Sequence, residues 1–196
     1  KGFSRMEKFH PFKTFMFFGI VGSTVLFLSM AFLYFLTLSR SGTPDNFVLP
    51  KAFSVRTVFL MLSSFSLSTA LSAYKNDSFY NLKLALWGTI ICGTIFCISQ
   101  VMGCKKMIDE GFFISSNVGV SYLFVITGIH FLHVAGGMIY MIVFTSGVMH
   151  KSGDISKSLM FLTDEFQKTK LELTIIYWHF VDILWLLLFF MFLFTF

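Results

Sequence analysis

The stretch from Thr14 to Leu38, TFMFFGIVGSTVLFLSMAFLYFLTL, decides the class of fold because its 25 residues include no charged side chain. About 20 apolar residues, at about 1.5 Å per residue, cross the hydrocarbon core of a bilayer. The stretch therefore predicts a transmembrane helix. It is also longer than the apolar core of a cleavable signal peptide, so we expect no such peptide.

Four more stretches of this kind follow, each bounded by charged residues. Residues 57–74, 84–104 and 111–149 lack Lys, Arg, Asp and Glu, and residues 173–196 contain only His179 and Asp182 as ionisable side chains. We predict an all-α membrane bundle that forms a single domain over residues 1–196. Its five transmembrane helices are expected at about 14–38, 53–74, 83–103, 117–149 and 173–196. Turn-forming residues cluster at 40–52, and the connection over 150–172 is the longest and most charged.

The composition supports this class of protein and excludes others. Hydrophobic residues make up 56% of the 196 residues and charged residues 13%, whereas a soluble domain has about 25% charged residues. Disorder and a soluble globule are therefore excluded. The net charge is +5, but Lys and Arg are dispersed, so we expect no nucleic-acid partner. The three cysteines lack the spacing of a zinc site, and we expect no metal site.

The distribution of basic residues predicts an orientation. Ten of the 15 Lys and Arg residues fall on the side that holds the amino terminus and the 75–83 and 150–172 connections. Cytoplasmic connections are enriched in Lys and Arg. We therefore expect a cytoplasmic amino terminus and a carboxyl terminus on the opposite side of the membrane.

Ionisable residues inside the fourth and fifth spans are candidates for a functional site. His130 and His133 are three residues apart and share a helix face, while Glu172, His179 and Asp182 share a face of the last span. A carboxylate at the depth of Asp182 costs about 2.5–3.5 kcal/mol to insert, so it must face protein or water, be paired, or be protonated. We expect an intramembrane polar network in which a histidine of the fourth span reaches this stripe.

Two uses of this network remain open. It locks two helices together through buried hydrogen bonds, or it carries a proton or a ligand. A haem held by His130 and His179 is a further alternative, but two of the three intramembrane histidines lie one turn apart and are poorly placed for opposite faces of one haem. Small residues in the second, third and fourth spans favour close packing between helices as their main role.

Two motifs resemble a known family. The segment Tyr177–Trp185, YWHFVDILW, preceded by Glu172, resembles the last-helix motif of subunit III of haem-copper terminal oxidases. The segment Phe124–Gly137, FVITGIHFLHVAGG, is similar to the preceding helix of that family. The motifs occur in the family's order, and the resemblance extends over essentially the whole chain. The chain resembles the five-helix form, which lacks the first two helices of the seven-helix form.

The resemblance implies an accessory subunit without catalytic residues, metal or redox cofactor of its own. Such a subunit binds subunit I, which carries haem and copper, in a complex that also contains subunit II. It binds phospholipid and supports assembly, proton uptake and stability during turnover in the bacterial inner membrane, with the carboxyl terminus periplasmic. Membership of a respiratory supercomplex is possible for this family. Lipid or subunit packing is expected at Trp178, Trp185, Gly128 and Gly137.

One position departs from the family pattern. The family often has a membrane-embedded Glu on the helix that corresponds to the first span, where this chain has Thr24. A carboxylate at that position is therefore absent.

The sequence does not separate a cytochrome c oxidase from a quinol oxidase, because that determinant lies in subunit II. The rivals from another class are a small membrane transporter and a haem-bearing membrane anchor.

Overall fold

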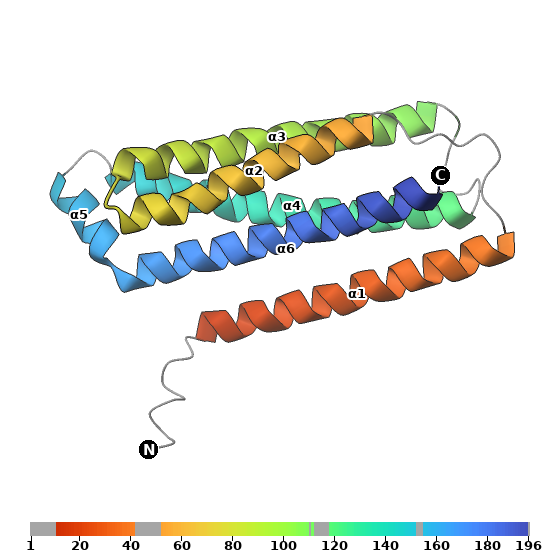
Figure 1. The fold of residues 1–196 in the computed structure, drawn as a ribbon, viewed down its shortest axis with the longest axis horizontal. Helices are drawn as coiled ribbons and strands as arrows, with labels where there is room; N and C mark the ends of the chain where they lie inside the picture. The colour runs from red at the N-terminus through yellow and green to blue at the C-terminus, as the bar shows by residue number, and fades with distance from the viewer. Residues whose placement is uncertain (1–10, 42–51, 110, 112–117, 152–154, 196) are drawn as a thin grey trace, which may run out of the picture.

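The fold is a bundle of long helices (Figure 1). The computed structural model describes residues 11–41, 52–109, 111, 118–151 and 155–195. The helices are α1 (Pro11–Ser41), α2 (Ala52–Lys75), α3 (Phe79–Asp109), α4 (Val118–Lys151), α5 (Ile155–Thr163) and α6 (Glu165–Thr195). No strand occurs in these ranges. Five of the helices are long and apolar enough to cross a membrane, which confirms the predicted all-α bundle of five spans.

The long helices run alternately in opposite directions, and α5 caps one end of the bundle (Figure 1). The helix pair α2 and α3 forms one side, α6 contacts α2 and α4, and α4 contacts α3. Helix α1 lies on the other side, against α4 and α6. Thus α6 occupies a central position, with neighbours from the beginning, middle and end of the chain.

Several helices extend beyond the expected spans. Helix α3 continues to Asp109 instead of ending near residue 103, and α6 begins at Glu165 instead of near residue 173. The connection expected over 150–172 is mostly helical, because it contains α5 and the first turns of α6. Charged residues limit a membrane span but not a helix, which continues into the polar region as long as its backbone bonds are made. The expected turn at 42–51 lies outside the described residues, as do residues 1–10 and 196.

A tight turn joins α2 to α3. Asp77 has a positive φ of 52°, a conformation that Asp and Asn tolerate better than most residues. The amide of Ser78 donates to the carbonyl of Ala73 at 3.0 Å, and the amide of Asn76 donates to Ser72 at 3.0 Å. These bonds satisfy the last carbonyls of α2 and reverse the chain within a few residues.

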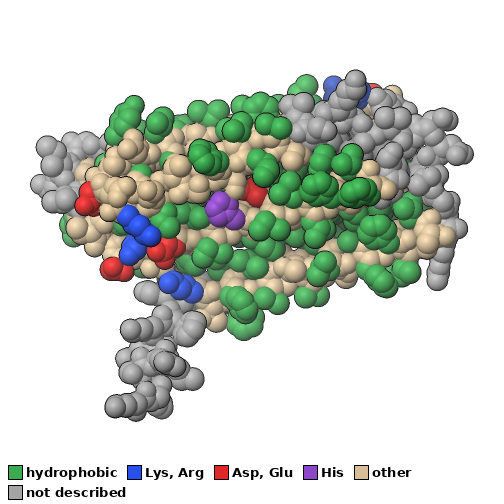
Figure 2. All heavy atoms as spheres, in the orientation of Figure 1, with side chains coloured by type: hydrophobic (Ala, Val, Ile, Leu, Met, Phe, Trp, Pro, Cys, Tyr) green, Lys and Arg blue, Asp and Glu red, His purple; other side chains and the backbone are tan. Residues whose placement is uncertain are grey.

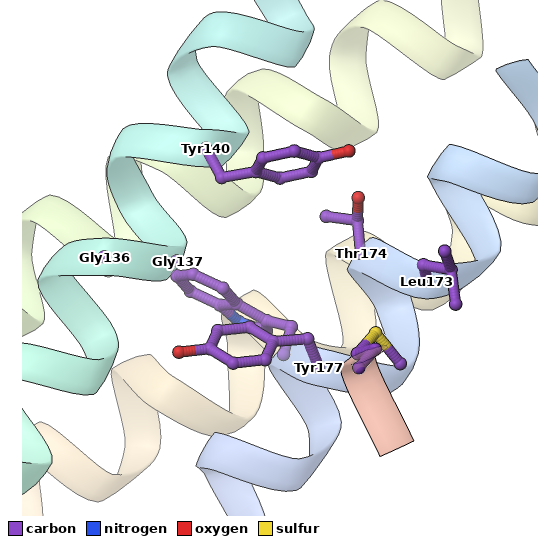
Figure 3. A pocket seen from close by; sticks show the side chains of 8 residues that line it. Gly136, Gly137, Tyr140, Leu173, Thr174 and Tyr177 are labelled. Atoms are coloured by element: carbon purple, nitrogen blue, oxygen red, sulfur yellow. The ribbon is translucent and has the colours of Figure 1, made fainter. Parts of the chain in front are cut away.

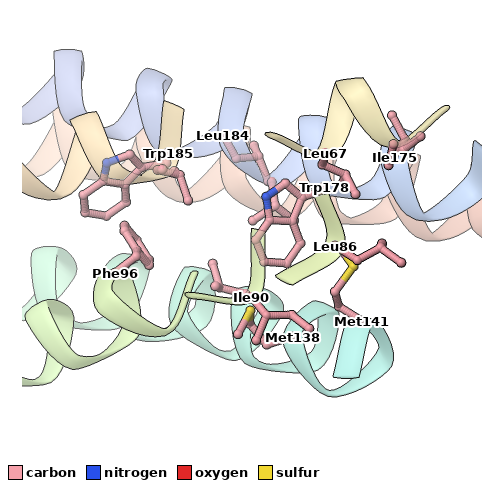
Figure 4. Packing of buried hydrophobic residues seen from close by; sticks show 14 of the residues in the cluster. Leu67, Leu86, Ile90, Phe96, Met138, Met141, Ile175, Trp178, Leu184 and Trp185 are labelled. Atoms are coloured by element: carbon pink, nitrogen blue, oxygen red, sulfur yellow. The ribbon is translucent and has the colours of Figure 1, made fainter. Parts of the chain in front are cut away.

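Aromatic side chains from α6 fill the centre of the bundle. Trp178 and Trp185 point from α6 toward α3 and α4 (Figure 4) and are only 2% and 0% exposed. The ring of Trp185 meets that of Phe96 edge-to-face, with centroids 5.1 Å apart. Trp178 lies near Ile90 and Met138 in the same cluster (Figure 4). Together these rings join α3, α4 and α6 into one core.

The outer surface is mostly apolar between its two ends. Exposed side chains include many Phe, Leu, Ile and Val residues, such as Phe15, Phe65 and Leu132. Figure 2 shows charged side chains near the ends of this face and, near its middle, one histidine beside an acidic residue. A soluble protein rarely exposes an apolar surface of this extent, so this surface is the one that faces a membrane interior.

Candidate functional site

Polar side chains of α2 hold α6 at three places along its length. The indole Nε1 of Trp178 donates to Ser63 Oγ at 3.0 Å, and that of Trp185 donates to Thr57 Oγ1 at 3.1 Å. Between them, Ser64 Oγ lies 2.6 Å from His179 Nδ1. Residues seven apart lie on nearly the same face of a helix, which explains why Trp178 and Trp185 both meet α2. The serine-rich second span thus supplies the partners of the last span.

Ser63 is fully satisfied in this arrangement. Its hydroxyl donates to the carbonyl of Leu60 at 2.7 Å and accepts from the Trp178 indole. Both residues are almost completely buried, at 0% and 2% exposure. A buried donor and acceptor that pair with each other stabilise the contact, because each would otherwise be unsatisfied in an apolar environment.

His179 and Asp182 line one pocket between α2 and α6. This α2/α6 pocket has a volume of about 250 Å³ and is lined by Thr57, Leu60, Met61, Ser64, His179, Asp182, Ile183 and Leu186. Asp182 is 7% exposed; the Ser64 hydroxyl lies near its carboxyl, but neither carboxyl oxygen makes a hydrogen bond of good geometry with a described residue. The structure therefore brings together His179 and Asp182, with Ser64 between the two helices.

His130 lies in a different environment. Its ring is completely buried among Phe27, Phe96 and Trp185, whose centroids lie 6.4, 6.1 and 5.1 Å away. Neither ring nitrogen has a hydrogen-bond partner within the described part of the chain. An imidazole with no partner in an aromatic cage is best accommodated in its neutral form. His130 does not line the α2/α6 pocket, which His179 lines.

His133 joins α4 to α1. Its Nδ1 lies 2.9 Å from the carbonyl of Ile129, and its Nε2 lies 3.0 Å from Ser23 Oγ. Since a carbonyl can only accept, Nδ1 carries the proton and Nε2 accepts from the Ser23 hydroxyl. The ring of Phe27 packs edge-on against His133 at 5.5 Å. This histidine therefore fixes the otherwise largely exposed first helix.

The predicted polar network is wrong in one respect. Helix α4 packs on α6 as expected, but no hydrogen bond joins His130 or His133 to Glu172, His179 or Asp182. Glu172 is half-buried, and its side chain forms no hydrogen bond or ion pair with a described residue. The reason is that these two histidines have other neighbours: aromatic rings surround His130, and Ser23 lies against His133.

The glycines of α4 have different roles from one another. A Cβ atom at Gly137 would lie 2.8 Å from Tyr177 Cε1, so only glycine permits this approach of α4 to α6. Tyr177 in turn donates to the carbonyl of His133 at 3.0 Å. Gly128 has no such contact within 4 Å, and its place on the bundle surface leaves it available to another molecule. Trp185, expected at a lipid or subunit contact, is instead buried within the chain.

A second pocket lies between α1, α4 and α6. This α1/α4/α6 pocket has a volume of about 300 Å³ and is lined by Met16, Gly136, Gly137, Tyr140, Leu173, Thr174, Tyr177 and Trp178. Figure 3 shows Tyr140 of α4 projecting across it toward Thr174 of α6, with Tyr177 below them. Most of the lining is apolar, so the pocket suits a hydrocarbon chain better than a polar solute.

A buried arginine was not anticipated from the sequence. Arg56 is 1% exposed, donates through Nη1 to Gln100 Oε1, and lies over the Trp185 ring at 5.8 Å. A Cβ atom at Gly103 would lie 3.0 Å from Arg56 Nη1. In the sequence, Arg56 is the charged residue that precedes the second span. Its acceptor Gln100 and the space left by Gly103 lie on α3, more than 40 residues away.

The donor set does not suggest a metal centre. Among the described residues, no group of three or more His, Cys, Asp and Glu side chains is placed to hold a metal ion. The three cysteines are free, and each is partly buried in α3. The polar side chains that the structure brings together bind one helix to another, and two of the pockets between the helices differ in character: one is mostly apolar, and the other contains a carboxyl and an imidazole.

The sequence is similar to subunit III of terminal oxidases in every comparison given below. Residues 9–196 match the family described as cytochrome c oxidase subunit III. Cytochrome c oxidase subunit 3 of Bacillus subtilis (strain 168) is 30% identical over 174 residues, which cover 86% of this chain and 78% of that protein. The same subunit of Alkalihalophilus pseudofirmus is 28% identical over 190 residues, covering 94% and 86%. Cytochrome bo(3) ubiquinol oxidase subunit 3 of Buchnera aphidicola subsp. Baizongia pistaciae is 25% identical over 173 residues, covering 87% and 84%.

Proposed function

This chain belongs to the cytochrome c oxidase subunit III family, and on that premise we propose that it is an accessory subunit without redox centres in a proton-pumping haem-copper oxidase. It binds subunit I, in a complex with subunit II, and supports assembly, proton uptake and stability during turnover. The observation that carries the proposal is the family match over residues 9–196, which includes all five spans. In this proposal haem and copper belong to the partner subunits.

The electron donor in this proposal is cytochrome c. Relatives with this name include the Bacillus subtilis protein, while the Buchnera relative is named a ubiquinol oxidase subunit. A quinol oxidase is therefore the alternative within the family. Oxygen consumption by the purified complex decides between them: we expect activity with reduced cytochrome c, and activity only with a quinol would establish the alternative.

The proposed location is the bacterial inner membrane, with the amino terminus cytoplasmic and the carboxyl terminus periplasmic. The start of α1, the α2–α3 turn and α5 lie at one end of the bundle (Figure 1). Lys75, Lys83, Lys168 and Lys170 belong to the segments at that end. The excess of basic residues supports a cytoplasmic position for it. A cysteine-accessibility measurement in intact cells tests this, since a cysteine near residue 153 should be protected until the membrane is opened.

The α1/α4/α6 pocket is the proposed site of a phospholipid chain. Tyr140 also lines a neighbouring pocket with Gln167 and Lys170, nearer the end of the bundle. The two pockets follow one another along α4, so an acyl chain in the first would direct its headgroup toward Lys170. A basic side chain at this place favours an anionic headgroup.

A pair of glycine variants tests the lipid site. A Cβ atom added at Gly136 or at Gly128 would have no neighbour within 4 Å, but only Gly136 lines the pocket. Gly136→Leu should fill the pocket and remove bound phospholipid from the purified complex, as measured by mass spectrometry. Gly128→Leu is the matched control and should retain it. Equal lipid content in the two variants would show that the pocket does not hold the lipid.

The role in turnover is tested by deleting this chain from the oxidase. The complex that remains should keep its haem spectrum and an initial oxygen-consumption rate near that of the full complex, but lose activity sooner during turnover. A complex without the chain that keeps full activity for as long as the wild type would overturn the proposed stabilising role.

A further inference from the structure

The α2/α6 pocket contains polar groups that the contacts within this chain leave unused. Asp182 is only 7% exposed, and the Ser64 hydroxyl lies near its carboxyl but is shared with His179 Nδ1, so neither carboxyl oxygen has a hydrogen bond of good geometry among the described residues. His179 uses Nδ1 for Ser64, and its Nε2 makes no hydrogen bond within the described residues. A buried polar group without a partner is unfavourable, so an oriented carboxyl and imidazole at one pocket point to a ligand that is missing from the isolated chain.

The depth of the pocket restricts what that ligand can be. The first turns of α6 are charged, so the part that crosses the membrane is residues 173–194, with its centre between residues 183 and 184. Asp182 therefore lies only about 2 Å from the centre, at about 1.5 Å per residue. Ser64 lies close to the centre of the 20-residue α2 span, Arg56–Lys75. The hydrocarbon core extends about 15 Å to each side of its centre, so lipid headgroups lie more than about 10 Å from these polar groups.

The surroundings of the pocket also favour a protein ligand. Its rim carries the exposed apolar side chains of Met61 and Ile183, at 51% and 63% exposure. The pocket lies on the outer face of the bundle between two helices, where a third helix packs by inserting side chains into the groove between them. An apolar rim around a polar centre suits a membrane helix that brings one polar side chain among apolar ones.

We propose that the α2/α6 pocket is the docking site for a transmembrane helix of a partner oxidase subunit, which inserts a hydrogen-bond-donor side chain toward Asp182 and His179. This inference rests on the proposed function, because it assigns the face by which the chain joins the oxidase. The terminal torsion of an Asp side chain is broad, so a small rotation turns a carboxyl oxygen toward the occupant. The donor satisfies Asp182 in the assembled complex.

Photo-crosslinking in the assembled oxidase tests this directly. A small aliphatic diazirine residue replaces Met61 or Ile183 at the pocket rim in separate preparations. The matched control carries the same residue in place of Leu132, which is 68% exposed and close to the centre of the α4 span Val118–His150. After illumination, cross-linked peptides are identified by mass spectrometry from complexes purified through a tag on this chain.

Cross-links from Met61 and Ile183 to one transmembrane segment of an oxidase subunit support the inference. Adducts with lipid alone at both rim positions, at the level found for Leu132, overturn it while the chain still co-purifies with the oxidase. Cross-links to a second copy of this chain also overturn it. Purification of the chain without oxidase subunits overturns the proposed function itself, so the two failures are distinguishable.

A pair of substitutions shows whether the polar groups contribute to docking. Asp182→Asn keeps a side-chain oxygen as an acceptor, whereas Asp182→Leu keeps a similar size without one. Loss of a charge-assisted hydrogen bond corresponds to a weakening of about ten- to a hundred-fold. We expect the Leu variant to dissociate from the oxidase faster by about this factor, and the Asn variant to lie between it and the wild type. Equal dissociation rates for all three chains, measured by detergent challenge, would contradict the inference.

Discussion

Replacing Gly137 with alanine should separate α4 from α6 and destabilise the bundle. The added Cβ atom would lie 2.8 Å from Tyr177 Cε1, closer than carbon atoms approach without displacement. Tyr177 cannot move away freely, because its hydroxyl donates to the His133 carbonyl at 3.0 Å on the neighbouring helix. The change therefore has to be absorbed by a shift of the helices or by loss of that hydrogen bond.

The magnitude follows from a comparison with Gly128→Ala on the same helix. Both changes gain about 1 kcal/mol of helix propensity, so this gain cancels in the difference between them. The Cβ atom at Gly128 has no neighbour within 4 Å. Overpacking costs about 1–3 kcal/mol, and we expect Gly137→Ala to be less stable than Gly128→Ala by about this amount.

The assay is unfolding of the purified chain in lipid–detergent micelles by increasing dodecyl sulfate, followed by far-ultraviolet circular dichroism. Tyr177→Phe provides a double-mutant test, because it frees the ring from His133 and lets it yield to the new Cβ atom. The cost of Gly137→Ala should then fall by at least about 0.5 kcal/mol. If the two alanine variants differ in stability by less than about 0.5 kcal/mol, the close approach of α4 to α6 at Gly137 is refuted.

Three further predictions follow from other contacts. Trp178→Phe removes the indole donor from buried Ser63 and should lower the free energy of unfolding by about 1–3 kcal/mol in the same assay; an unchanged stability would contradict the buried hydrogen bond. Asp182→Asn in the assembled oxidase should leave the initial oxygen-consumption rate near normal and speed loss of the chain or of activity during turnover, whereas an immediate, pH-dependent fall in rate would identify a proton-transfer residue. Tyr74→Phe removes the hydroxyl that donates to the Phe161 carbonyl at 2.7 Å, so proteolysis near α5 should become faster. A rate of proteolysis equal to that of the wild type would contradict this prediction.

The five spans could be predicted because charged residues bound each apolar stretch, and each stretch is long enough to cross a bilayer. The same information does not give the lengths of the helices, since α6 begins at Glu165 in a segment rich in charge. There the side chain of Asp164 accepts from the Phe166 amide at 2.9 Å and caps the helix. This cap precedes the apolar residues by two turns, so hydropathy alone does not detect it.

The neighbours of each polar residue were harder to predict than its depth. Helical spacing placed His179 and Asp182 on one face, and the structure has both in the α2/α6 pocket. It did not indicate that His133 would pair with Ser23, because spans that are apolar on all sides carry no signal for which helix lies next to which. Helix α1 packs on α4 and α6, far from it in the sequence.

Whether a polar side chain is buried in a membrane bundle also depends on residues of other helices, which the sequence of its own helix does not reveal. Arg56 precedes the apolar run of α2 and yet is 1% exposed, because Gln100 accepts from it and Gly103 leaves room for its guanidinium. His130 is enclosed by rings from three other helices. Both environments depend on residues that lie at least 30 positions away in the sequence.

Native mass spectrometry of the complex purified through a tag on this chain tests the central claim most directly. The account predicts one assembly that contains the chain together with subunits I and II of a haem-copper oxidase, with haem and copper lost along with those subunits when the complex is dissociated. A mass that corresponds to the chain alone or to copies of itself, or haem that stays with the isolated chain, would contradict it.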